Sequence, residues 1–170
     1  PYIARQVRVT IPIHLAPLSW SSFQLVEGPA AQSDGIFQNG VIDTPFVTVS
    51  VDEGITVYDK TTNEAYEDFI QFEDRGDIGN EYIYFQPKGT EPIFAQLKGY
   101  EVLENNSRYA KVLLKHDLTI PVSADEKLDA EQRGIIEFMK RDAGRSEELT
   151  TIPLETEMTV FVDNPQIRFK

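Results

Sequence analysis

The chain has 170 residues and is strongly acidic: 28 Asp and Glu against 16 Lys and Arg leave a net charge of -12. Such a surface repels nucleic-acid phosphates and anionic membranes, whereas a neutral ligand such as a sugar meets no comparable repulsion. Cysteine is absent, which excludes disulfides, thiolate metal sites and cysteine nucleophiles, and it fits a cytoplasmic protein. The longest apolar runs span only a few residues, too short to cross a bilayer.

The first third of the chain predicts short strands separated by turns. Apolar and polar residues alternate over residues 7–13, which is typical of a strand with one apolar face. Residues 16–28 predict a turn and a second short strand, with Trp20 and Phe23 as core anchors. The Gly- and Asn-containing stretch 28–40 is typical of a loop or linker.

The next strands are marked by clear alternation. Residues 47–57 predict a β-hairpin whose tight turn takes a positive φ at Gly54. A second polar turn follows at residues 59–66. Long strands are predicted over residues 110–120 and 152–162, where most of the even-numbered residues are apolar.

One region has a helical rather than a strand pattern. Between the two long strands, residues 123–148 are rich in helix-forming residues, and Ser123 is a candidate N-cap. Gly134 weakens the interior of this predicted helix and Gly144 is a candidate for its end. Its apolar positions fall loosely on one face: Leu128, Ile135, Ile136 and Met139.

Many short strands with at most one helical excursion predict an all-β fold, an antiparallel β-sandwich. We expect residues 1–30 to be the end of a small β-domain and residues 31–170 to form an incomplete sandwich. The chain begins at Pro1 rather than at a methionine, and we expect it to be a piece of a longer protein.

The densest mixture of charge, glycine and aromatic residues is "EDRGDIGNEYIYFQP", residues 73–87. Asp74, Asp77 and Asn80 recur every three residues, but this spacing differs from that of a calcium loop, so a solvated acidic loop is the favoured interpretation. The Arg-Gly-Asp tripeptide at residues 75–77 is too short a match to indicate adhesion. The aromatic residues that follow are equally typical of a half-buried strand.

Catalytic motifs are weak in the remainder of the chain. The two histidines, His14 and His116, lie on separate predicted strands without zinc-ligand spacing, which favours ordinary strand residues. A Ser-His-Asp triad has no nucleophile-elbow motif to support it. Paired carboxylates for glycoside cleavage stay open, because sequence gives no separation between them.

A family resemblance rests on several stretches in the same order. "FEDRGDIGNEYIYFQP" resembles the D-x-G-D-x-G-x-E-Y-x-F-x-P stretch of bacterial α-mannosidases of glycoside hydrolase family 38. The upstream "GITVYDKTTNEAYEDFIQFED" resembles the hairpin of that family. The likeness continues through the opening "VRVTIPIHLAPLSWSSFQLVE" and the closing "RSEELTTIPLETEMTVFVDNPQIRFK". It therefore covers nearly the whole chain.

The resemblance implies a retaining, exo-acting α-mannosidase whose zinc ion and aspartate nucleophile lie in a catalytic barrel. No zinc-ligand or nucleophile motif of that barrel occurs in this sequence. The chain then corresponds to a β-rich portion that follows the helical bundle, with no cofactor of its own, and it is expected to be inactive alone. Its partners would be the α-mannoside substrate and the catalytic barrel of the same protein.

The resemblance also implies one substrate contact. Tyr82 corresponds to the tyrosine that reaches from the β-domain and hydrogen-bonds the mannose, and Asp77 and Asn80 would shape its loop and contact substrate less directly. Tyr84 or Phe85 is then expected to pack in the core. A stand-alone carbohydrate-binding module and a purely structural module stay as alternatives, and linkage preference and homo-oligomerisation are left open.

Overall fold

The computed structural model describes residues 11, 13–24, 26, 28 and 34–170. The chain divides into two units, residues 1–32 and residues 33–170. Most of the strand predicted over residues 7–13 lies outside the described residues. The assignment of residues 1–30 to a preceding β-domain stays a prediction.

The described residues of the first unit form a turn but no strand. Both the amide and the hydroxyl of Ser19 donate to the main-chain oxygen of Ala16, at 3.2 and 2.6 Å. Trp20 and Phe23 are exposed by 85% and 60%. Their prediction as core anchors is wrong, because the described residues of this unit form no sheet that could cover them.

The second unit contains two main sheets, one small sheet and a short helical region. The five-stranded sheet has the order β1-β2-β3-β4-β5, the four-stranded sheet the order β11-β10-β9-β8, and β6 pairs only with β7. All pairs are antiparallel. The bounds of the elements are β1 Phe37–Gln38, β2 Val41–Asp43, β3 Val47–Ser50, β4 Thr56–Asp59, β5 Glu64–Tyr66, β6 Glu73–Asp74, β7 Ile93–Phe94, β8 Gln96–Asn105, β9 Tyr109–Pro121, α1 Lys127–Arg133, the 3-10 turn η1 Phe138–Lys140, β10 Leu149–Phe161 and β11 Ile167–Phe169.

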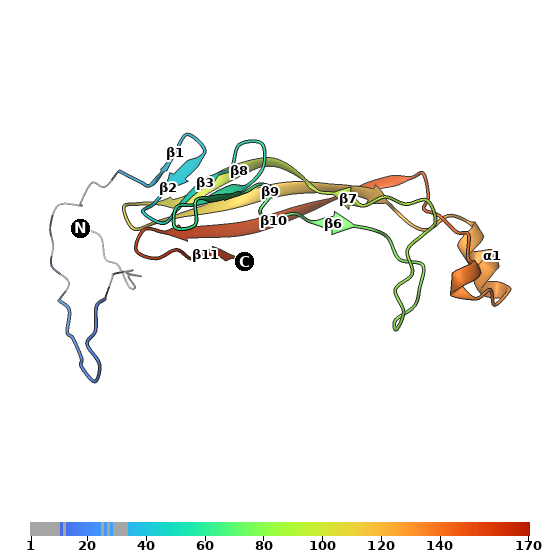
Figure 1. Ribbon diagram of the computed structural model, residues 1–170, viewed down its shortest axis with the longest axis horizontal. Helices are drawn as coiled ribbons and strands as arrows, with labels where there is room; N and C mark the ends of the chain where they lie inside the picture. Colours follow the sequence, from blue (N-terminus) through green and yellow to red (C-terminus); the bar gives the residue numbers. More distant parts are fainter. Residues whose placement is uncertain (1–10, 12, 25, 27, 29–33) are drawn as a thin grey trace, which may run out of the picture. The chain divides into compact units, whose positions relative to one another are not determined.

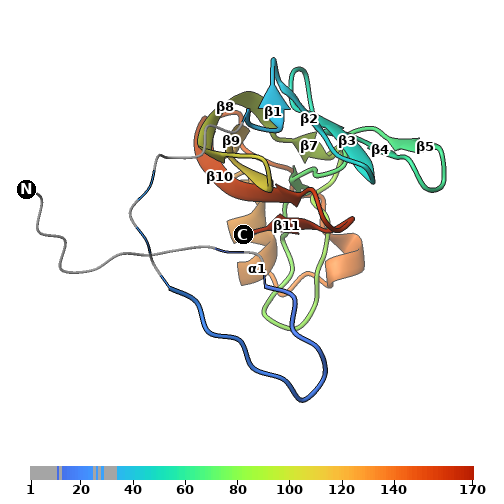
Figure 2. The same ribbon diagram turned by 90° about the vertical axis from the view of Figure 1, so that its left-hand side faces the viewer.

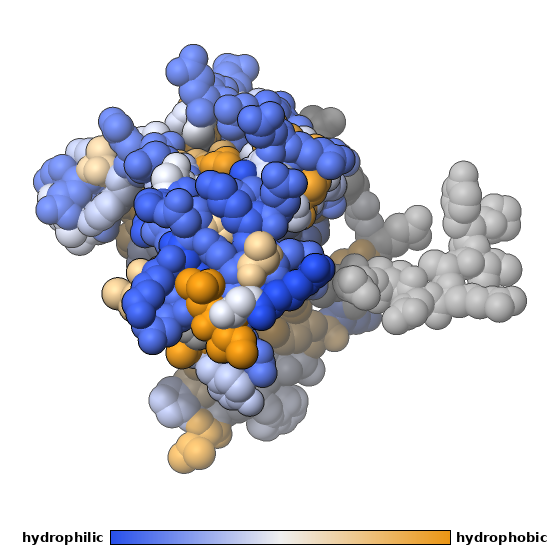
Figure 3. Space-filling model, turned by 90° about the vertical axis from the view of Figure 1, so that its right-hand side faces the viewer, coloured by the Kyte–Doolittle hydropathy of each residue, from blue (hydrophilic) through white to orange (hydrophobic). Residues whose placement is uncertain are grey.

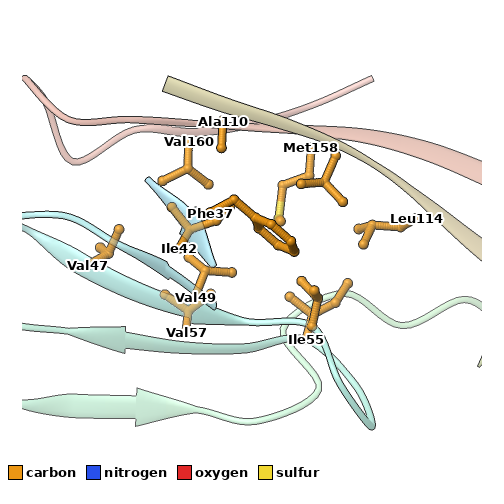
Figure 4. Packing of buried hydrophobic residues seen from close by; sticks show 12 residues of the cluster. Phe37, Ile42, Val47, Val49, Ile55, Val57, Ala110, Leu114, Met158 and Val160 are labelled. Carbon is orange, nitrogen blue, oxygen red and sulfur yellow. The ribbon is translucent and has the colours of Figure 1, made fainter. Parts of the chain in front are cut away.

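The two main sheets pack face to face, which confirms the predicted all-β sandwich. Figure 2 shows β1 to β5 side by side, above β9, β10 and β11. In Figure 4, side chains of the five-stranded sheet point toward Ala110, Leu114, Met158 and Val160 of β9 and β10. The opposing residues are Phe37, Ile42, Val47, Val49, Ile55 and Val57. Burial of these apolar side chains supplies the main stabilisation of the sandwich.

The two long strands confirm the alternation in the sequence. β9 pairs with β10 along thirteen consecutive positions, from Tyr109↔Phe161 to Pro121↔Leu149. Along β9 the even-numbered residues from Ala110 to Leu118 are buried, and the odd-numbered ones lie on the outer face. There Lys111 Nζ lies 3.2 Å from a carboxylate oxygen of Glu104, and the hydrogen bond raises the pKa of Lys111.

The predicted hairpin is present, but its turn differs from the prediction. Val47↔Asp59 and Ser50↔Thr56 fix the register of β3 and β4. Gly54 does not have a positive φ, so that part of the prediction is wrong. The five-residue connection is long enough to turn without a left-handed glycine.

A hairpin that sequence reasoning missed lies in the predicted linker. β1 and β2 are joined by Asn39-Gly40, whose φ angles are 50° and 79°. Two successive positive φ values define a type I′ turn, for which Asn-Gly is the preferred dipeptide. The flanking residues, Phe37-Gln38 and Val41-Ile42, carried the signal that would have found it.

The helix is shorter than predicted at both ends. Ser123 does not cap α1: its hydroxyl donates to the oxygen of Ala124, while Glu126 is the N-cap and makes no side-chain capping bond. The helix ends at Gly134 rather than at Gly144, because the next residue, Ile135, has a φ of 53° that a helix cannot contain. The predicted apolar positions therefore do not share one helical face.

His116 gives the sandwich a pH dependence that can be measured. The side chain is buried, its Nδ1 has no partner among the described residues, and its ring lies edge-on to Phe72, with 5.4 Å between ring centroids. Burial lowers the pKa of His116 below its ordinary value of 6.5, because the apolar surroundings disfavour the charged imidazole. Below pH 6.5 the unfolded chain therefore binds a proton at His116 that the folded chain does not bind.

We therefore expect the free energy of unfolding to be highest above pH 6.5 and to fall as the pH drops from about 7 to about 5. Urea unfolding at both pH values measures this loss. His116→Leu removes the titrating group and should flatten the profile between them. Equal pH profiles of the original protein and the variant would contradict the assignment.

Candidate functional site

The candidate site is the loop that connects β6 to β7, residues 75–92, here called the tyrosine loop. Its root is fixed because Glu73 and Asp74 pair with Phe94 and Ile93. In Figure 1 the loop is the green segment that extends toward the same end of β9 and β10 as α1. All three predicted substrate-contacting residues, Asp77, Asn80 and Tyr82, lie in it.

Asp77 closes the loop across its neck. Its Oδ1 accepts hydrogen bonds from the amides of Gly79 and Phe85, at 2.7 and 3.0 Å. Beside it the amide of Ile78 donates to the oxygen of Phe85, at 2.8 Å. One carboxylate oxygen thus joins residues eight positions apart, which an aspartate does well because it accepts two amide donors at once.

Asn80 shapes the tip in the same way. Its Oδ1 accepts hydrogen bonds from the main-chain amides of Tyr82 and Ile83, at 2.9 and 3.0 Å. The main-chain amide of Asn80 donates to the main-chain oxygen of Ile83, also at 3.0 Å. This is a side-chain-stabilised turn of the kind that asparagine favours. The side-chain oxygen of Asn80 is therefore committed to the backbone of the tip.

The turn directs Tyr82 outward. Tyr82 is 86% exposed, Ile83 is 49% exposed and Tyr84 is 56% exposed. The expectation of core packing is wrong for Tyr84, because the narrow tip has no second layer of its own; Phe85 is half-buried. A mostly exposed tyrosine on a hydrogen-bonded turn offers an apolar ring and a phenol to a ligand.

The base of the tyrosine loop is held by the segment that precedes β10. Ile78 is buried, and its main-chain oxygen accepts a hydrogen bond from Nη1 of Arg141 at 2.6 Å. The amide of Lys88 donates to the oxygen of Ala143, at 3.0 Å. Sequence reasoning missed these anchors because they lie more than fifty positions away along the chain and belong to no motif.

Two ion pairs join the same two segments. Lys88 pairs with Asp142, and this hydrogen bond raises the pKa of Lys88 and lowers that of Asp142. Both side chains are exposed, so the pair contributes little to stability. Arg145 pairs with Asp74 at the root of the loop, and its side chain is only 9% exposed.

The described residues offer no metal centre. Among them no group of three or more His, Cys, Asp or Glu is arranged to hold a metal ion. Asp74 is paired with Arg145, and the side-chain oxygens of Asp77 and Asn80 accept main-chain amides. The zinc ion that the resemblance implies therefore finds no fitting ligand set in this part of the chain.

A polar hollow of about 450 Å³ lies elsewhere, beside the β3–β4 connection. It contains no residue of the tyrosine loop, and its lining is mainly acidic: Ser50, Asp52, Glu53, Gly54, Thr56, Glu67 and Asp68. Within the described ranges, no helix is both long and apolar enough to cross a membrane.

The fold and the loop define an antiparallel β-sandwich domain with a projecting, aromatic-tipped loop. No family model matches the chain. Over 110 residues it is 39% identical to a "Putative mannosylglycerate hydrolase" of Halalkalibacterium halodurans. The aligned region covers 62% of this chain and 12% of that protein.

Two solved structures from Enterococcus faecalis share the fold. One is a protein of glycosyl hydrolase family 38, with a TM-score of 0.76, 31% sequence identity, and coverage of 84% of this chain and 18% of that one. The other is an α-mannosidase from strain V583, with a TM-score of 0.74, 31% identity, and coverage of 82% and 16%. These matches confirm the predicted resemblance to glycoside hydrolase family 38. The chain spans less than a fifth of the length of each relative.

Proposed function

We propose that this chain is the β-sandwich portion of a longer α-mannosidase related to family 38, and that its tyrosine loop forms one wall of the sugar-binding site. The observation that carries the proposal is the outward-facing Tyr82 on a turn held by Asp77 and Asn80. The similarity to family 38 proteins supports the glycosidase assignment. The catalytic residues and the zinc ion would then belong to another domain of the longer protein.

Within this proposal Tyr82 binds rather than reacts. Its phenol can exchange a hydrogen bond with a sugar hydroxyl, and its ring can cover an apolar face of the pyranose. Asp77 and Asn80 hold the backbone that carries it. Terminal α-mannosides are the substrate class, and a mannosylglycerate-like compound is one member that the named relative suggests. The lack of cysteine suits a reducing compartment, so we place the protein in the cytoplasm.

Tyr82→Phe tests the substrate contact. In the full-length protein we expect kcat/KM for an aryl α-mannoside to fall by about 5- to 150-fold, the equivalent of about 1–3 kcal/mol for one lost hydrogen bond. Tyr66→Phe is the matched control, because Tyr66 is also exposed but lies on β5 and donates to Glu64. Unchanged kinetics in Tyr82→Phe would remove Tyr82 from the site.

The exposed aromatic tip also suits a second function, a stand-alone carbohydrate-binding module. The two functions differ in what residues 1–170 do alone. As a wall of a larger site, the chain should bind mannose too weakly for calorimetry and should not hydrolyse an aryl α-mannoside. Saturable binding that Tyr82→Ala abolishes would favour the stand-alone module, and turnover by the isolated chain would contradict both.

A further inference from the structure

The segment between β9 and β10, residues 122–148, here called the α1 arm, adds nothing to the core of the sandwich. α1 buries none of its residues, and no residue of the arm belongs to the main hydrophobic cluster. Ile135 and Met139 are 88% and 85% exposed. Figure 3 looks onto this end of the molecule and shows hydrophobic residues at its surface among hydrophilic ones. Core stability therefore does not explain the arm.

The contacts of the α1 arm go instead to the tyrosine loop. Arg141 donates to the oxygen of Ile78, between Asp77 and Gly79. The oxygen of Ala143 accepts from the amide of Lys88 on the returning limb of the loop. At the root of the loop, the Cβ of an alanine at Gly76 would lie 3.2 Å from the Arg145 side chain. The loop and the α1 arm are therefore closely packed there. The arm thus reaches both limbs and the base of the loop.

The arm is itself braced at the residues that make these contacts. The carboxylate of Glu131, in α1, accepts from the amides of Asp142 and Ala143, at 2.6 and 3.4 Å. The amide of Asp125 donates to the main-chain oxygen of Gly144, and the amide of Gly144 donates to Oδ2 of Asp125, both at 3.0 Å. Glu131 of α1 and Asp125, which precedes the helix, therefore hold the backbone of residues 142–144, next to Arg141.

We propose that the α1 arm positions the tyrosine loop, and that Arg141 is its main positioning residue. The inference rests on the proposed role of Tyr82 at a sugar site. Arg141 fixes the main chain at Ile78, one residue from Asp77, whose carboxylate closes the neck below Tyr82. Holding the loop before substrate arrives avoids ordering it on binding, and small displacements of a positioned group are costly in rate.

The first test needs only residues 1–170. Arg141→Ala should speed amide exchange at the loop donors Gly79, Ile83 and Phe85 by about tenfold, while exchange in β9 and β10 stays the same. Arg133→Ala is the matched control: it removes the same charge from the same arm, but Arg133 is exposed and pairs only at 3.5 Å with Asp129. Unchanged exchange at the three loop amides would overturn the proposal.

The second test measures turnover in the full-length protein. Arg141→Ala should lower kcat/KM for an aryl α-mannoside by about 10- to 100-fold, Arg141→Lys should recover part of it because an ammonium can still donate to the Ile78 oxygen, and Arg133→Ala should have no effect. In a Tyr82→Phe background the Arg141→Ala loss should shrink, because both changes act on one contact. A merely structural role would give the same loss in both backgrounds.

The two proposals fail in different ways. If Tyr82→Phe lowers turnover and Arg141→Ala does not, the positioning role is overturned and the sugar site stands. If Arg141→Ala loosens the loop while neither substitution changes turnover, the loop contact stands and the proposed function is wrong.

Discussion

Replacing Leu114 with alanine is expected to lower the free energy of unfolding by about 2–5 kcal/mol, the range for a large-to-small change in a packed core. Leu114 is fully buried on β9, and Figure 4 shows it beside Met158 and facing the five-stranded sheet. Truncation removes apolar contacts and leaves a cavity between two sheets whose paired strands cannot readily collapse. Urea denaturation of the two proteins at one pH measures the difference.

Leu113→Ala is the matched control for this change. Leu113 is the preceding residue of the same strand, pairs with Glu101 and Glu157, and is only half-buried on the outer face. Its loss should cost about 1 kcal/mol. Equal losses at the two positions would mean that the sandwich core does not lie on the even-numbered face of β9.

The parts of the fold that the sequence predicted are those in which one physical cause acts along many residues. Period-2 alternation over β9 and β10 follows from burial of one face, so its length alone made the two strands predictable. The turn at Asn39-Gly40 depended on two residues inside a polar stretch, and the composition of that stretch concealed it. The ends of α1 depended on the backbone at Ile135, which no periodicity reports.

The candidate site divides in the same way. Tyr82, Asp77 and Asn80 lie together in the sequence, and the hydrogen bonds that join them are local, so a motif could find them. Arg141 and Ala143 reach the loop only because β9 and β10 return the chain to the same end of the sheet. A contact of this kind follows from topology, and a single sequence contains no local signal for it.

Replacing Gly79 with alanine is expected to disrupt the tyrosine loop more severely than any change at its tip. A Cβ on Gly79 would overlap the main-chain oxygen of Ile83, which cannot move away as the end of a flexible side chain could. That oxygen accepts the amide of Asn80, and the amide of Gly79 donates to Asp77. Relief of the overlap therefore requires that the hydrogen bonds of the tip and of the neck be broken together.

We expect Gly79→Ala to reduce kcat/KM of the full-length protein toward an aryl α-mannoside by about 100-fold or more, because Tyr82 loses its position as well as its support. Thermal unfolding of residues 1–170 should change little, since the tip contributes nothing to the main hydrophobic cluster.

Gly89→Ala is the control that separates steric overlap from backbone strain. Gly89 also lies in the loop and has a φ of 69°, but a Cβ there meets nothing within 4 Å. Gly89→Ala should lower the free energy of unfolding by only about 1–2 kcal/mol, the conformational cost of an alanine in the left-handed region. Unaltered loop exchange and turnover in Gly79→Ala would show that the tip does not have the conformation described, whereas a loosened loop with unaltered turnover would leave the geometry intact and remove the sugar site from it.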